Sequence, residues 1–215
     1  MLKNIPLFSG LEADQIETLR KVLLVKTYPK NVYLFSEGDP SDSFYIVEKG
    51  KVNVGINDEE GREVILSVLG PGEYFGEMAL LDGEPRCAYV MTKERSKLLI
   101  ISKREFENLL NANPGIMLGL LKGLQKRLRE ANKRIESLAL MDVYGRVARL
   151  LTQIAGTPRE EDVVITDKMT HQEIANMVGA SREMVSRVLK DMTNEGYISI
   201  QQKRITLHKK LPYEL

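Results

Sequence analysis

The spacing of apolar residues changes twice along the chain. Near the start, Ile16, Leu19 and Leu23 recur at helical spacing, which predicts an amphipathic helix over 11–24. From 32 to 101 the pattern changes to short β-favouring runs separated by glycine and aspartate turns. These runs are Val32–Phe35, Phe44–Val47, Val52–Ile56, Val64–Leu69, Cys87–Met91 and Leu98–Ile101. Such close spacing favours an antiparallel sandwich or barrel.

After Pro114 the period becomes helical and stays so over a long stretch. The apolar residues recur at alternating intervals of four and three: Met117, Leu121, Leu124, Leu128, Ala131, Ile135 and Leu138. These residues form a narrow apolar stripe along the helix, which we call the seam. Such a stripe is typical of a coiled coil, and it favours pairing in a parallel dimer over packing on the β domain alone. The basic residues off the seam are expected mostly on solvated faces (Lys122, Lys126, Arg127, Arg129, Lys133 and Arg134). A further helix is predicted from Asp142 to Ile154.

The last segment has the pattern of a helix-turn-helix. The stretch 170–173 reads Thr-His-Gln-Glu, a capping box that opens one helix; Gly179 ends that helix and Ser181 caps the next. The second helix has a buried side of Val185, Val188, Leu189 and Met192, and an opposite side of Arg182, Glu183, Ser186, Arg187 and Lys190. Two β-favouring runs joined through 201–204 predict a basic-tipped hairpin, the wing of a winged helix. An ordinary helical hairpin with a charged solvated face is the alternative.

Composition narrows the possible classes of protein. In 215 residues, 31 Lys and Arg nearly balance 30 Asp and Glu, so any basic surface must be local. The single cysteine, Cys87, excludes an intrachain disulfide and a cysteine-built zinc or iron–sulfur centre. The two histidines, His171 and His208, fall in the C-terminal segment, which disfavours a haem sensor. Neither an exported leader nor a membrane span is predicted, and we expect a cytoplasmic location.

One charged pair stands in an otherwise apolar stretch. The stretch 75–90 reads FGEMALLDGEPRCAYV, with Glu77 after a glycine and Arg86 at the head of an apolar run. A buried guanidinium requires an opposite charge, which leaves two possibilities: Glu77 is its structural partner, or a ligand anion is.

Taken in order, these motifs resemble the Crp/Fnr family of bacterial transcription regulators, in particular its cAMP-responsive members. The resemblance covers essentially the whole chain and is carried by GEMALLDGEPRCA at 76–88 and HQEIANMVGASREMVSRVLKDM at 171–192. It implies an α+β fold: a cyclic-nucleotide-binding β-roll (jelly roll) over 1–113, a dimerisation helix over 114–141, and a winged helix-turn-helix DNA-binding domain over 142–215.

The resemblance also implies a nucleotide site. Gly76 turns the backbone into a short helix whose free N–H groups face a phosphate, Arg86 binds the same phosphate, and Glu77 accepts from the ribose 2′-hydroxyl. The remaining site positions are Met78, Ala79, Cys87, Ala131 and Asn132. Cys87 stands where cAMP-binding relatives often have Ser, and Ala131-Asn132 where they have a Thr-Ser pair. The implied effector is therefore cAMP, with cGMP or no nucleotide left open.

For DNA, the resemblance implies that Arg182, Glu183 and Arg187 read bases of a TGTGA-like half-site in an inverted repeat. Ser186 belongs to the same face, and the residues expected at phosphates are Thr170, Gln172, Ser181, Lys190 and Lys203. RNA polymerase is an implied partner, through a loop over 156–162. No catalytic residue and no metal site are predicted. Two alternatives stay open: a nucleotide-independent regulator, and a nucleotide-binding module that regulates an enzyme or channel without binding DNA.

Overall fold

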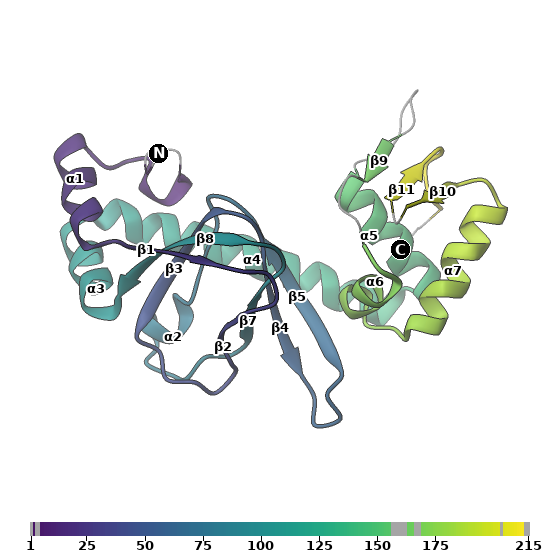
Figure 1. The fold of residues 1–215 in the computed structure, drawn as a ribbon, viewed down its shortest axis with the longest axis horizontal. Coiled ribbons are helices and arrows are strands. Elements are labelled where there is room, and N and C mark those ends of the chain that lie inside the picture. Colours follow the sequence, from purple (N-terminus) through teal and green to yellow (C-terminus); the bar gives the residue numbers. More distant parts are fainter. Residues whose placement is uncertain (1, 3–4, 156–162, 166–168, 203, 213–215) are drawn as a thin grey trace. The chain divides into compact units, whose positions relative to one another are not determined.

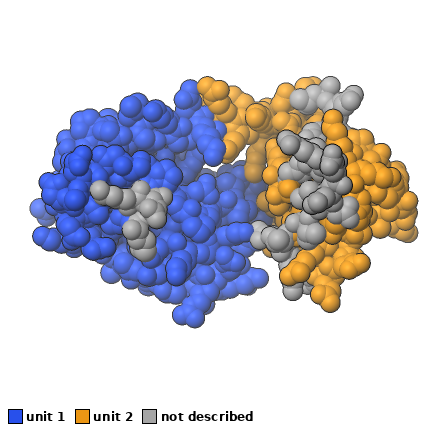
Figure 2. Space-filling model, turned by 90° about the horizontal axis from the view of Figure 1, so that it is seen from above, with its two compact units in different colours: residues 1–127 blue, residues 128–215 orange. Residues whose placement is uncertain are grey.

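The computed structural model describes residues 2, 5–155, 163–165, 169–202 and 204–212, and these form two compact units. Unit 1 is residues 1–127 and unit 2 is residues 128–215, shown in separate colours in Figure 2. The boundary falls inside the long helix α4 (Pro114–Leu140), so each unit contains part of that helix. The expected order of a β domain, a long helix and a helix-turn-helix is confirmed (Figure 1).

The described part of unit 1 is built on two antiparallel four-stranded sheets. The first has the order β1 (Leu24–Tyr28), β8 (Ser96–Ser102), β3 (Ser43–Lys49), β6 (Tyr74–Phe75). The second has the order β2 (Tyr33–Phe35), β7 (Tyr89–Thr92), β4 (Val52–Asn57), β5 (Glu63–Leu69). Short helices complete the unit: a 3-10 turn at Pro6–Phe8, α1 (Ala13–Val22), α2 (Met78–Leu81) and α3 (Lys103–Ala112).

Strand β8 of the first sheet is buried on both faces. In β8, Leu98 and Ile100 join the core that also holds Val47 and Phe75, whereas Leu99 and Ile101 join a second core against the helices. Because successive side chains of a strand point to opposite faces, a strand covered on both sides reads as an unbroken apolar run. That is why the predicted run 98–101 shows no alternation.

Several predicted boundaries in unit 1 were wrong. The predicted first helix ran to Leu24, but α1 ends at Val22 and Leu24 opens β1, because that segment pairs with β8. The predicted strand over 87–91 is β7 at Tyr89–Thr92, which leaves Cys87 outside the strand and exposed.

The described part of unit 2 contains the end of α4, three further helices and a small sheet. The helices are α5 (Val143–Ala155), α6 (His171–Val178) and α7 (Arg182–Asn194). The described strands pair antiparallel in the order β10 (Ile198–Gln201), β11 (Arg204–Leu207), β9 (Val163–Ile165). The hairpin β10–β11 confirms the predicted wing, and one core holds the helices and wing together through residues such as Val147, Ile174 and Leu189.

The part of α4 that belongs to unit 1 lies close to the rest of that unit at two glycines. A Cβ added at Gly119 would lie 3.3 Å from Leu7 Cδ1, and one at Gly123 would collide with the Tyr74 hydroxyl. That hydroxyl is buried and has no hydrogen-bond partner among the described residues. The absence of a side chain at these positions therefore sets how closely α4 approaches the β-roll.

We expect Gly123→Ala to destabilise the protein by about 1–3 kcal/mol, since the added methyl overpacks a filled interface. In a Tyr74→Phe background, which lacks the colliding oxygen, most of that cost should disappear. Gly115→Ala is the matched control: it lies on the same helix with open space around its Cβ, and it should stabilise by about 0.4–1 kcal/mol. Urea unfolding of the four variants gives the values, and an unchanged cost in the Tyr74→Phe background would contradict the prediction.

Candidate functional site

A turn between β6 and α2 forms one candidate site. Gly76 adopts φ +84°, a left-handed conformation that favours glycine. A Cβ at this position would lie 2.6 Å from Arg86 Nη1 and 3.1 Å from the Ser43 carbonyl oxygen. Glycine is therefore required both for the turn and for the approach of Arg86 to the backbone.

Arg86 is buried, with 4% of its surface exposed. Nη1 donates to the Gly76 carbonyl at 2.9 Å and Nη2 to the Ser43 carbonyl at 2.7 Å. The guanidinium lies over the Phe35 ring, 4.1 Å from its centroid, and Nε is buried without a partner among the described residues. Burial lowers the pKa of Arg86, because the interior disfavours its charge. Its charge is stabilised by carbonyl dipoles and an aromatic face, and the Nε donor has no partner among the described residues.

Glu77 is still more buried, at 1% exposed, and its partner is Arg127 rather than Arg86. Arg127 Nη1 lies 2.6 Å from Glu77 Oε1, and Nη2 donates to the Tyr74 carbonyl. Burial raises the pKa of Glu77, and the Arg127 charge opposes that rise. Glu77 therefore pairs with Arg127, and no ion pair joins it to Arg86. Glu77 Oε2 is buried without a partner among the described residues.

Arg127 is the site residue that the sequence reasoning missed. It was placed with the basic residues on the solvated faces of α4, but it is half-buried and its cation lies over the Tyr74 ring at 4.8 Å. The available signal was spacing: Arg127 follows Gly119 and Gly123 at intervals of four, so it continues the face that approaches the β-roll.

The other expected nucleotide residues differ in exposure. Met78 and Cys87 are exposed, whereas Ala79 is buried in α2. Partial burial raises the pKa of the Cys87 thiol. Ala131 and Asn132 are exposed on α4, in its part that belongs to unit 2. The turn thus brings together Gly76 and Arg86, while Glu77 contacts α4 through Arg127.

The helix-turn-helix forms the second candidate site, and its predicted caps are confirmed. Thr170 Oγ1 accepts from the Glu173 amide at 3.1 Å, and Glu173 Oε2 accepts from the Thr170 amide at 2.7 Å. Gly179 ends α6 with φ +65°, and Ser181 Oγ accepts from the Met184 amide at 3.2 Å. These local bonds fix the directions of both helices.

Helix α7 presents a polar face to solvent. Arg182, Glu183, Arg187 and Lys190 are exposed, and Ser186 is half-buried. The backbone amide of Glu183 and the hydroxyl of Ser181 hold the pKa of Glu183 below its ordinary value, so the carboxylate stays an acceptor. Gln172 is exposed and donates to Asn176 Oδ1 at 2.7 Å, whereas Lys203 and the loop 156–162 lie outside the described residues.

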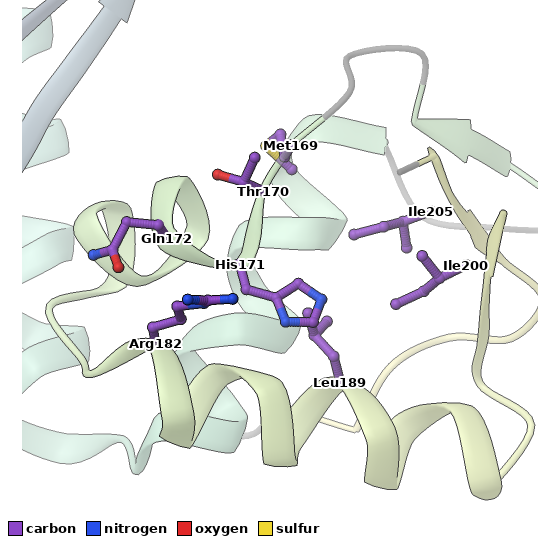
Figure 3. A pocket seen from close by; sticks show the side chains of 8 residues that line it. All are labelled: Met169, Thr170, His171, Gln172, Arg182, Leu189, Ile200 and Ile205. Atoms are coloured by element: carbon purple, nitrogen blue, oxygen red, sulfur yellow. The ribbon is translucent and has the colours of Figure 1, made fainter. Parts of the chain in front are cut away.

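A hollow of about 570 Å³ opens between the start of α6, α7 and the wing (Figure 3). Its polar side carries Thr170, His171, Gln172 and Arg182, and its apolar side Met169, Leu189, Ile200 and Ile205. His171 Nδ1 lies 2.7 Å from Ser186 Oγ. In the described part of the chain, no helix is both long and apolar enough to cross a membrane, and no side-chain cluster has the composition of a metal site.

Two protein-family models match the parts of the chain that contain the turn at Gly76 and the helix-turn-helix. Residues 25–113 match the cyclic nucleotide-binding domain, and residues 145–210 match the Crp-like helix-turn-helix domain. The chain is 34% identical over 210 residues to a CRP-like cAMP-activated global transcriptional regulator of Mycobacterium tuberculosis, covering 96% of this chain and 94% of that protein. It is 38% identical over 186 residues to the cAMP-activated global transcriptional regulator CRP of Haemophilus influenzae, covering 84% and 82%.

Two solved structures extend the similarity to the fold. The c-di-GMP responsive global regulator CLP of Xanthomonas campestris superimposes with a TM-score of 0.81 at 28% identity, covering 95% of this chain and 100% of that one. The catabolite activator protein of Thermus thermophilus gives a TM-score of 0.57 at 32% identity, covering 95% and 94%.

We expect Arg127→Ala to destabilise the protein by about 2–3 kcal/mol at pH 8, because it leaves the Glu77 carboxylate buried and unpaired. The pKa of Glu77, already raised, should rise further, so its carboxyl is neutral over more of the acidic range and the loss should be smaller at pH 5. Urea unfolding at both pH values checks this. Arg129→Ala, on an exposed face of the same helix, is the control, and equal losses at the two pH values would contradict the prediction.

Proposed function

This chain belongs to the Crp/Fnr family of transcription regulators, and from that premise we propose that it is a homodimer that binds an inverted repeat of TGTGA-like half-sites under the control of cAMP. The family assignment makes it a DNA-binding regulator that a cyclic nucleotide controls. The observation that carries the effector proposal is a pair of buried polar atoms, Glu77 Oε2 and Arg86 Nε. They have no hydrogen-bond partner among the described residues and are opposite in hydrogen-bonding character.

The two atoms fit a cyclic nucleotide. A ribose 2′-hydroxyl can donate to Glu77 Oε2 while Oε1 keeps its bond to Arg127. A phosphate can accept a hydrogen bond from Arg86 Nε, and a charge-assisted bond to an anion is stronger than a bond to a neutral carbonyl. We infer that the ligand completes this site without displacing the Glu77–Arg127 pair. The base contact, assigned to Ala131 and Asn132, is less specific than the ribose and phosphate contacts. The experiment below therefore includes cGMP and c-di-GMP beside cAMP.

The exposed seam of α4 supports the proposed dimer. Its apolar members include Leu128 and Ile135, which are 62% and 63% exposed in the single chain. Their spacing is that of a two-stranded coiled coil. A second copy of this helix is the partner that would bury them.

DNA contacts are assigned to α7 and its surroundings. Arg182 and Arg187 can each donate two hydrogen bonds to guanine O6 and N7, and Glu183 can accept from cytosine N4. Lys190, Ser181, Gln172 and Thr170 lie beside them for phosphates, although the hydroxyls of Thr170 and Ser181 already cap helices. We further propose that the protein acts in the cytoplasm and contacts RNA polymerase when bound to DNA.

The effector is tested by fluorescence anisotropy of a palindromic duplex with two TGTGA half-sites, at one fixed salt concentration. We expect tight binding with cAMP and binding at least about tenfold weaker without nucleotide, with cGMP and c-di-GMP as parallel arms. Arg86→Lys keeps a charge but loses the planar fork, and should lose the response to nucleotide. Arg62→Ala, an exposed arginine bonded to Asp58, is the control.

Each outcome discriminates between functions. Tight binding with and without nucleotide would favour the nucleotide-independent regulator. Nucleotide binding without any DNA binding would favour a regulatory module of another protein class. A full cAMP response in Arg86→Lys would contradict the assigned phosphate contact.

The dimer is tested by a charge placed in the seam. Leu128→Glu should convert the dimer to a monomer and reduce affinity for the palindrome by more than about tenfold, since two half-sites are then no longer bound together. Light scattering on a sizing column measures the mass. Arg129→Glu puts the same side chain beside the seam on an exposed face and should remain dimeric; a dimeric Leu128→Glu protein would contradict the proposed interface.

A further inference from the structure

The hydrogen bond between His171 and Ser186 joins the two helices of the DNA-binding motif, and the contacts proposed above do not use it. His171 is the first residue of α6 and Ser186 lies in the second turn of α7. Both side chains are half-buried, and Nδ1 lies 2.7 Å from Oγ. Figure 3 shows the His171 ring over α7, between Arg182 on one side and Ile200 and Ile205 on the other.

Ser186 occupies the middle of a polar stripe on α7. Arg182, Ser186 and Lys190 are spaced by four, so they follow one another along the same side of the helix. The two cations are exposed. A hydroxyl has one donor and two acceptor positions, so Ser186 keeps part of its hydrogen-bonding capacity after bonding to His171. Whether Ser186 can then donate to DNA or only accept depends on whether His171 donates to its hydroxyl or accepts from it.

The hydrogen bond between His171 and Ser186 can run in two opposite directions. DNA brings phosphate oxygens to this surface, and these only accept, so Nε2 of a neutral ring keeps the proton and Nδ1 accepts from the Ser186 hydroxyl. Ser186 then offers only lone pairs to a base. When the ring is protonated, Nδ1–H donates to Oγ, and the Ser186 proton is free to donate outward. Cytosine N4 complements the first arrangement, whereas thymine O4 complements the second.

We propose that His171 is a positioning residue that sets the hydrogen-bond direction of Ser186, so that protonation of the ring changes the base preference at one position of each half-site. This inference rests on the proposed DNA-binding function, and it adds a regulation of that same site by pH.

The charges around the ring act in opposite directions. Among the described residues lining the hollow, Arg182 carries a positive charge. On α6 itself, Glu173 Oε2 is bonded to the amide and hydroxyl of Thr170. From the wing, Ile200 and Ile205 are apolar and Arg204 is exposed. In the complex, DNA phosphates bring negative charge to this surface.

The experiment measures a ratio of affinities, in which phosphate effects shared by both duplexes cancel. Full-length protein with saturating cAMP is titrated, at pH 6 and pH 8 and one salt concentration, with palindromes carrying symmetric C·G or T·A pairs at each half-site position. We expect the C·G to T·A affinity ratio to fall by about fivefold to tenfold from pH 8 to pH 6 at a single position, and to stay constant elsewhere.

Three variants identify the residues responsible. His171→Gln cannot change its charge and Ser186→Ala has no hydroxyl, so each should bind DNA with a ratio that is independent of pH. His208→Gln is the matched control, because it removes the other of the two histidines and a similar bond, from Nε2 to Ser199 Oγ at 2.9 Å. The shift should persist in this control.

Contrary results are distinct from failure of the proposed function. A ratio that does not change with pH at any position, or a shift that survives in His171→Gln, overturns this inference alone. If the wild-type protein binds none of the duplexes at either pH, both the inference and the DNA-binding proposal fail. Nitrogen-15 spectra of the DNA-bound protein at pH 8 add a direct measurement: a proton on Nδ1 of His171 would overturn the inference, and an unprotonated Nδ1 is expected.

Discussion

The burial of the Glu77 carboxylate is the constraint on which much of unit 1 depends. A carboxylate that is 1% exposed requires a cation, and the cation comes from α4, 50 residues further along the chain. Arg127 can reach it only because α4 lies close to the β-roll, and that approach depends on glycine at 119 and 123. One buried charge thus links the turn, the strand β6 and the long helix, and leaves Glu77 Oε2 without a partner among the described residues.

What the sequence predicted well was governed by local physics. The capping box at Thr170, the left-handed Gly179 and the cap at Ser181 each depend on residues within four positions, and all three are present. The turn at Gly76, which the family resemblance implied, is also present. The strands that were recognised also had a local signal, apolar runs between turn residues. The helix-turn-helix and the β domain could therefore be placed from the residue pattern alone.

What the sequence did not reveal depends on long-range pairing. The predicted helix ended at Leu24 and no strand was predicted before Val32, yet Leu24–Tyr28 is a strand because it pairs with β8. Arg127 has the same local pattern as its exposed basic neighbours, and only the fold brings it to Glu77. The His171–Ser186 bond likewise joins residues on two helices whose relative direction is fixed by the turn between them. Each of these three features depends on a contact between separate helices or strands, which the spacing of apolar residues does not reveal.

The glycine face of α4 also bears on how such proteins exchange modules during evolution. Ile116 and Leu120 are part of the core of unit 1, and so the β-roll does not end where the helix begins. A recombination event that joined a new output domain directly after 113 would remove these two side chains and leave an apolar face of the β-roll open to water. Gene fusions that preserve folding should therefore cut downstream of 127, within the helix, and inherit its register together with the sensory domain.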